Sequence, residues 1–140
     1  MKIDDSWFRQ YQKMSEDEKE LFHEFDMSEN QKWLIVDYNK LKNAVYLLSI
    51  KPEELKSNFT DKINIINEIA LIFFDEGMYP AERLYKENCI NEDVYTEVLE
   101  IDKILSEISL DRNCWTIKAY NTDVKWKKCR LCAKELLSKL

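Results

Sequence analysis

The chain has 140 residues and a mass of 16.9 kDa, which suits one domain with a single hydrophobic core. Hydrophobic residues make up 45% of it and charged residues 34%, a composition that excludes a disordered chain and a chain built of long apolar stretches. One glycine, two prolines and one histidine provide too little material for glycine-rich phosphate loops, hairpin-rich sheets or sites with several histidine ligands.

Two capping boxes mark helix starts in the first part of the chain. Ser15 precedes Glu18, and Ser28 precedes Gln31, by the three residues that let each pair bond reciprocally to backbone N–H groups. We expect a short helix before the first box, a second helix after it and a longer one after the second box, although Trp33 to Val36 alone would also suit a strand. The expected apolar stripes are Trp7, Phe8 and Tyr11, then Leu21, Phe22 and Phe25, then Leu34, Tyr38, Leu41, Val45 and Leu48.

The middle of the chain predicts two further helices and a sharp junction. Pro52 suits the first turn of one helix, and Thr60 with Asp61 caps the next. Gly77 stands where a left-handed residue would end that helix, and Pro80 follows. The apolar positions of the helix before Gly77 are Ile63, Ile66, Ile69, Ala70, Phe73 and Phe74.

The segment around Gly77 resembles the first helix and turn of a tetratricopeptide repeat over about 15 residues. The residues that carry this resemblance are Ile69, Ala70, Phe73, Gly77 and Tyr79. Ala81 falls one place early for the alanine of the second helix, and no counterpart recurs one repeat length away. An ordinary helical hairpin is therefore the prediction.

The last third of the chain predicts helices that begin at Asn91, at Asp111 and at Thr122 with Asp123, the last of them ending close to Leu140. The buried face of the helix after Asn91 comprises Val94, Val98, Ile101, Leu105 and Ile108. Apolar positions of the final helix include Val124, Cys132, Leu136 and Leu140. The prediction for residues 1–140 is an all-α, single-domain bundle of about six to eight helices.

The histidine and the closely spaced cysteines of the chain lack the neighbouring residues that a metal site or a nucleophilic centre needs. His23 lies in a Glu-x-x-His spacing with Glu20, but the chain has no second histidine to complete a metal site. Cys129 and Cys132 have the spacing of redox or zinc cysteines, yet they fall inside the expected final helix. We expect buried thiols there, and neither a metal nor a cofactor.

Charge is unevenly distributed along the chain. The net charge is −6, yet residues 75–111 carry −8 and residues 112–140 carry +6. Such segregation arises either from packing of one segment against the other or from separate binding faces. The basic segment includes Trp115 and Trp126, a combination that also suits a nucleic-acid surface. The negative net charge of the whole chain disfavours such a surface, so we expect no direct nucleic-acid binding.

Two acidic surfaces are candidate sites for binding a protein partner. In the helix after Asn91, helical spacing places acids on one face around Ile104, an arrangement in which charge steers a basic partner and the apolar residue slows release. That set is Asp93, Glu97, Glu100, Ile104, Glu107 and Asp111. The second candidate is the column of Glu16, Glu20 and Glu24.

In composition, a small, acidic, glycine-poor helical domain resembles the immunity proteins of bacterial toxin systems. The resemblance implies a protein that binds a cognate toxin, often a basic nuclease, and covers its active site or an adjoining surface. The first residues lack the apolar segment of a secretory signal, so we expect a cytoplasmic protein with no membrane partner. The alternatives are a helical adaptor that binds peptides in an apolar groove and, third, a carboxylate enzyme that uses a divalent metal; we expect no enzyme.

Overall fold

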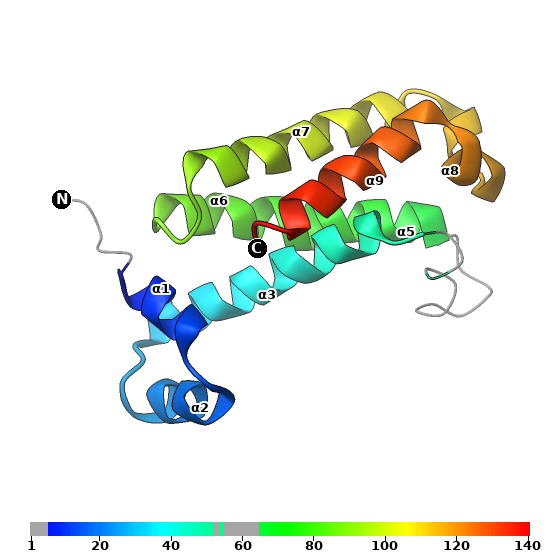
Figure 1. Ribbon diagram of the computed structural model, residues 1–140. Coiled ribbons are helices and arrows are strands. Elements are labelled where there is room, and N and C mark those ends of the chain that lie inside the picture. Colours follow the sequence, from blue (N-terminus) through cyan, green and yellow to red (C-terminus); the bar gives the residue numbers. More distant parts are fainter. Residues whose placement is uncertain (1–5, 52–53, 55–64) are drawn as a thin grey trace.

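The computed structural model describes residues 6–51, 54 and 65–140, and every regular element in these ranges is helical (Figure 1). The predicted all-α fold is thus confirmed. The expected helix start at Pro52, the cap at Thr60 and Asp61, and Ile63 lie outside the described residues. In chain order the elements are α1 (Ser6–Lys13), α2 (Glu16–Phe25), α3 (Glu29–Ser49), α5 (Ile65–Ile72), the π-helix η2 (Phe73–Met78), α6 (Tyr79–Lys86), α7 (Glu92–Ser109), the 3₁₀-helix η3 (Arg112–Cys114), α8 (Ile117–Thr122) and α9 (Val124–Leu137).

Four rods form the bundle within the described ranges: α3, the run from α5 through η2 to α6, α7, and α9 (Figure 1). α3 packs against α6, η2 and α9, and α7 packs against α6, η2 and α9, so each rod has two neighbours around one core. In this part of the chain no helix is both long and apolar enough to cross a bilayer.

The bundle core is apolar and comes from all four rods. Burial of these side chains is the main favourable term in folding, at about 25 cal/mol per Å² of apolar surface. Among the side chains with no exposed surface are Leu41 and Val45 of α3, Ile69 and Phe73 of the second rod, Val98, Ile101, Leu105 and Ile108 of α7, and Cys129, Ala133 and Leu136 of α9.

Local capping sets the helix starts as the sequence predicts. Both boxes are complete: the hydroxyls of Ser15 and Ser28 accept hydrogen bonds from the backbone N–H groups three residues on, and the Glu18 and Gln31 side chains accept from the two serine N–H groups. α3 continues as one helix through Trp33 to Val36, so no strand forms there.

The same confirmation holds in the last third of the chain. The side chains of Asn91, Asp111 and Asp123 cap α7, η3 and α9. A further cap was not predicted: the Thr116 hydroxyl accepts a hydrogen bond from the N–H of Ala119 at the start of α8.

The junction predicted at Gly77 is wrong, because the helical rod continues through Gly77 and Pro80 as η2 and α6. No described glycine has a positive φ. Gly77 is buried, and a Cβ built on it lies 3.0 Å from Cδ2 of Phe73, so a larger residue here would press on the Phe73 ring. Pro80 follows η2 in the first turn of α6, where a residue without an N–H is tolerated.

The sharp turn occurs instead at Asn88, whose φ is 61°. The N–H of Asn88 donates to the carbonyl of Tyr85, and the N–H of Cys89 donates to the carbonyl of Leu84. These two bonds are a Schellman motif, in which asparagine takes the left-handed position that glycine more often holds. The chain reverses there and enters α7.

The first two helices extend the bundle at one end. Phe8 of α1 is buried against Met27 and Ile35, and its ring lies 5.0 Å from that of Tyr38 on α3. The Tyr38 hydroxyl donates a hydrogen bond to the carbonyl of Leu140 at 2.7 Å. α2 lies beyond α1 and the start of α3, outside the four rods (Figure 1).

Candidate protein-docking surfaces

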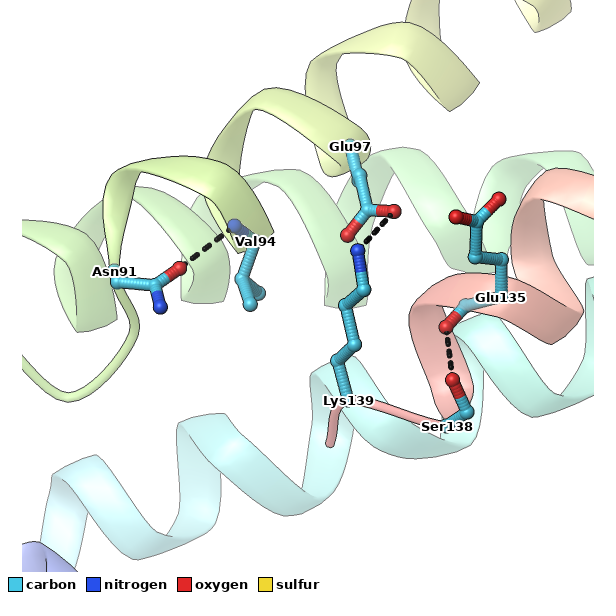
Figure 2. A network of polar contacts seen from close by, with 6 residues as sticks. All are labelled: Asn91, Val94, Glu97, Glu135, Ser138 and Lys139. Atoms are coloured by element: carbon cyan, nitrogen blue, oxygen red, sulfur yellow. Dashed lines mark hydrogen bonds and ion pairs between the residues drawn. The ribbon is translucent and has the colours of Figure 1, made fainter.

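α7 lies beside α9 (Figure 1), and only part of the acidic face predicted on α7 is exposed. Asp93, Glu100 and Glu107 are exposed along one edge of the helix. Glu97 is only partly exposed, because its Oε1 accepts a 2.9 Å hydrogen bond from Nζ of Lys139, which follows α9 (Figure 2). This bond is the first cause of the raised pKa of Lys139.

Ile104 was expected among the α7 acids as an exposed apolar contact, and this expectation is wrong. Its side chain is 3% exposed and belongs to the bundle core. The reason is the width of the buried stripe of α7: both α9 and the α5–α6 rod pack against this helix, so its buried face extends past Ile101 and Leu105 to Ile104. A partner that docks on this face would meet carboxylates without an apolar centre.

Asp111, the last residue of that predicted set, is exposed and has a local structural role. Its Oδ1 accepts a hydrogen bond from the N–H of Asn113 at 2.9 Å, which begins η3. The thiol of Cys114 also lies 3.6 Å from its Oδ2.

Packing brings the acidic and basic segments of the chain together. The Glu97–Lys139 pair joins α7 to the end of α9, and the pKa of Cys132 on α9 is raised first by burial, with Glu97 and Glu100 among the nearby charges that contribute. Of the two explanations that the sequence left open, packing of one segment against the other accounts for this contact.

The second predicted acidic surface, on α2, is fully exposed. Glu16, Glu20 and Glu24 all face solvent, and α2 buries none of its side chains. The apolar stripe expected on this helix is only partly covered: Phe22 is partly buried, whereas Leu21 is 58% exposed and Phe25 is 72% exposed. The reason is that α2 lies outside the four rods, and no described rod covers this side of it.

One side of α2 holds it to the rest of the molecule. The ring of Phe22 lies 6.2 Å from that of Tyr11 on α1, and Nζ of Lys19 lies 5.2 Å from the centre of the Tyr11 ring. Lys19 also pairs with Glu16 at 3.8 Å. Because Lys19 and Phe22 share this inner side, the opposite side of α2 carries the exposed acids and Leu21.

The outer side of α2 combines negative charge with apolar surface. We call Asp17, Glu20, Leu21, Glu24 and Phe25 the α2 surface; all five are exposed. Among the described residues, none forms an ion pair with Asp17, Glu20 or Glu24. Sequence reasoning identified the acids and the apolar spacing but not the exposure of Leu21 and Phe25, because amphipathic spacing looks the same whether or not a neighbour covers the stripe.

A cleft of about 400 Å³ lies between α3 and α6. At its side the Asp37 carboxylate binds the Arg83 guanidinium through two hydrogen bonds. The cleft is lined by Asn30, Trp33, Leu34, Asp37, Lys40, Arg83, Lys86 and Glu87, of which Trp33 and Leu34 are the two apolar residues.

The cysteines of α9 lie inside the helix, as predicted. Cys129 is fully buried, and burial raises the pKa of its thiol to about 12. A thiol in this state is neutral at pH 7 and is a poor nucleophile and metal ligand. Among the described residues, no three His, Cys, Asp or Glu side chains are placed to hold a metal ion, and His23 is exposed on α2.

The tryptophans of the basic segment serve the fold. Trp126 is 1% exposed, and its indole N–H donates a 2.7 Å hydrogen bond to the carbonyl of Cys114. Its ring lies edge-on to those of Trp115 and Tyr120, and the guanidinium of Arg130 lies 4.8 Å from the centre of the Tyr120 ring. Trp126 is therefore a core residue and has no exposed face on which a base would stack.

The chain was compared with protein-family models, with curated proteins and with solved structures, and none of the three comparisons finds a match.

Proposed function

We propose that the protein acts by binding a basic protein partner through the α2 surface and inhibits that partner by covering its active site or an adjoining surface, as an immunity protein covers a toxin. One observation carries the proposal: Leu21 and Phe25 lie exposed beside acids that no described residue pairs with. In this role the protein needs no catalytic group of its own.

The combination of charge and apolar area supports this role. Carboxylates steer a positively charged partner toward the surface and raise the association rate, whereas buried apolar anchors slow dissociation. Anchors that dominate binding energy are large side chains near the centre of the contact, and Phe25 is of this kind. The α7 acids lack such a centre because Ile104 is buried, so we place them second.

The adaptor alternative has less support from the described residues. It needs an apolar groove between helices, and the cleft between α3 and α6 holds the Asp37–Arg83 ion pair with Lys40, Lys86 and Glu87. Only Trp33 and Leu34 contribute apolar side chains to its lining.

The direct test uses the product of the gene next to this one in the genome. Purified wild-type protein should bind that product, block its activity and bind less tightly as salt rises, because salt screens exposed charges. Exchange of Glu20 and Glu24 for lysine should weaken binding by at least about tenfold, since each steering charge is reversed. Exchange of Leu21 and Phe25 for alanine should weaken binding with an unchanged salt dependence.

The matched control reverses Asp75 of η2 and Glu92 of α7, two exposed acids outside both predicted acidic surfaces, and it changes the net charge of the protein by the same amount. This control variant should bind within about threefold of the wild type, because salt screens the effect of charges that lie far from the contact. If both double variants weaken binding equally, the effect comes from net charge and not from the α2 surface. If the Glu20/Glu24 variant binds like the wild type, the α2 surface is not the binding site. No binding by the wild-type protein would reject the inhibitor role.

A further inference from the structure

A second exposed surface, at the other end of the molecule, carries the opposite charge. Val124, Lys127, Lys128 and Leu131 of α9 are spaced by three, one and three residues and therefore share one face of the helix. All four are exposed, Val124 by 77% and Leu131 by 66%. We call these four residues the α9 surface.

The α9 surface, like the α2 surface, combines charge with apolar area, and its charge has the opposite sign. Two apolar side chains flank two lysines that form no ion pair with any described residue. The opposite face of α9 holds Trp126, Cys129 and Leu136 and is buried in the bundle. The exposed face therefore points away from the core, and the core does not cover it. Exposed apolar residues within a charged rim are typical of contact surfaces.

We infer that the α9 surface of one molecule binds the α2 surface of a second copy of this chain. Lys127 and Lys128 carry the charge opposite to that of the three acids of the α2 surface, Asp17, Glu20 and Glu24. Leu21 and Phe25 offer apolar area to Val124 and Leu131. Complementary charge beside apolar area gives both specificity and orientation to such a contact.

The placement of the two surfaces prevents one molecule from making this contact with itself. α2 lies at one end of the structure, and the first turns of α9 lie beside α8 at the other end (Figure 1). The contact is therefore heterologous, with different surfaces on the two partners, and it generates a ring or an open chain of molecules. Because the contact uses charged, exposed surfaces, salt should weaken it.

Sedimentation velocity over a concentration series tests the inference with the full chain. At an ionic strength of about 0.05 M, attraction between exposed charges extends beyond about 10 Å, and the wild type should form species larger than a monomer. Higher salt should dissociate these species. Reversal of Lys127 and Lys128 to glutamate should weaken self-association at least tenfold, and so should reversal of Glu20 and Glu24 to lysine. The control exchanges Lys40 and Lys103, two exposed lysines of α3 and α7, for glutamate and should self-associate like the wild type.

Mixing the two defective variants gives the decisive outcome. The Lys127/Lys128 variant keeps an intact α2 surface, and the Glu20/Glu24 variant keeps an intact α9 surface, so a mixture of the two should regain self-association. The two reversed surfaces are also complementary in charge, so the mixture should again form species larger than a monomer. A Leu131→Ser variant should also lose self-association without a charge change. A wild-type protein that stays monomeric throughout, or a mixture that stays monomeric, would overturn the inference.

The proposed self-association rests on the same α2 surface as the proposed function, but the two proposals can be disproved separately. The Lys127/Lys128 variant should lose self-association and still bind the product of the neighbouring gene. A monomeric wild type that binds this product would leave the proposed function standing without the self-association.

Discussion

The carboxylate of Asp37 on α3 accepts hydrogen bonds from both Nε and Nη2 of Arg83 on α6, at 2.8 and 2.7 Å. The two side chains differ in environment, because the Asp37 side chain is 6% exposed and that of Arg83 is 55% exposed. A buried carboxylate needs such a donor, since burial of a charge without a partner is costly. The pair therefore joins two rods of the bundle and satisfies an acid that lies at the edge of the core.

We expect Arg83→Met to lower the free energy of unfolding by about 1–3 kcal/mol, because Asp37 would lose its charged donor. Replacing both residues, with Asp37→Leu added, should recover part of this loss, since no buried charge remains. Lys86→Met is the control, because its pair with Glu82 is exposed and should contribute less than about 1 kcal/mol. Urea denaturation measures all four proteins, and wild-type stability of the Arg83 variant would contradict the assignment.

We expect Ile104→Ala to destabilise the fold by about 2–4 kcal/mol, because the side chain is 3% exposed and its removal leaves a cavity beneath α9. Leu99→Ala on the exposed side of the same helix should cost much less, within about 1 kcal/mol. Thermal and urea denaturation would distinguish the two. If Ile104→Ala leaves the free energy of unfolding unchanged, the assignment of Ile104 to the core is wrong and the expectation of an exposed contact residue is restored.

Gly77→Ala tests the close contact inside η2. In an ordinary helix this exchange stabilises by about 1 kcal/mol. Here the new Cβ lies 3.0 Å from the ring of the fully buried Phe73, so we expect no gain and a net loss of about 1 kcal/mol. In a Phe73→Leu background the same exchange should become less unfavourable. A stabilised single variant would show that the Phe73 ring moves aside easily.

The pH dependence of stability tests the burial of Cys129. Burial raises the pKa of its thiol to about 12, above the value of about 8.5 in an unfolded chain. The folded state keeps the proton while the unfolded state releases it, so this contribution to stability is complete below about pH 8 and is lost as the pH rises through about 9 to 12.

Cys129→Ala provides the comparison, because it lacks this titration and keeps the other groups of the protein. Between about pH 9 and 11 the stability of the wild type should fall more steeply than that of the variant, by at most about 1.4 kcal/mol per pH unit. Parallel curves for the two proteins would mean that the thiol is not held neutral by burial. Urea denaturation at each pH gives the measurement.

Helix starts were predictable because capping is local. The boxes at Ser15 and Ser28 and the caps at Asn91 and Asp123 satisfy backbone N–H groups within three residues of the cap. The long buried stripe of α7, from Val94 to Ile108, was equally readable because helical periodicity repeats over five positions.

The candidate site was only partly readable. The sequence indicated the acids of α2 and α7, but it placed Ile104 outside the core and did not show that Leu21 and Phe25 of the α2 stripe are exposed. The spacing of these residues is amphipathic in both helices, and exposure depends on which rods pack beside each helix. The continuation of the helix through Gly77 was also missed, because this glycine has no positive φ and instead lies against the ring of Phe73.

By itself, then, the sequence determined the all-α class, the helix starts and the segregation of charge, since each follows from propensity, capping or composition along short stretches of chain. Only the tertiary structure decided which acids and apolar residues face solvent. Burial is a property of neighbours far apart in the chain: α9 and the α5–α6 rod cover Ile104, whereas no described rod covers the outer side of α2.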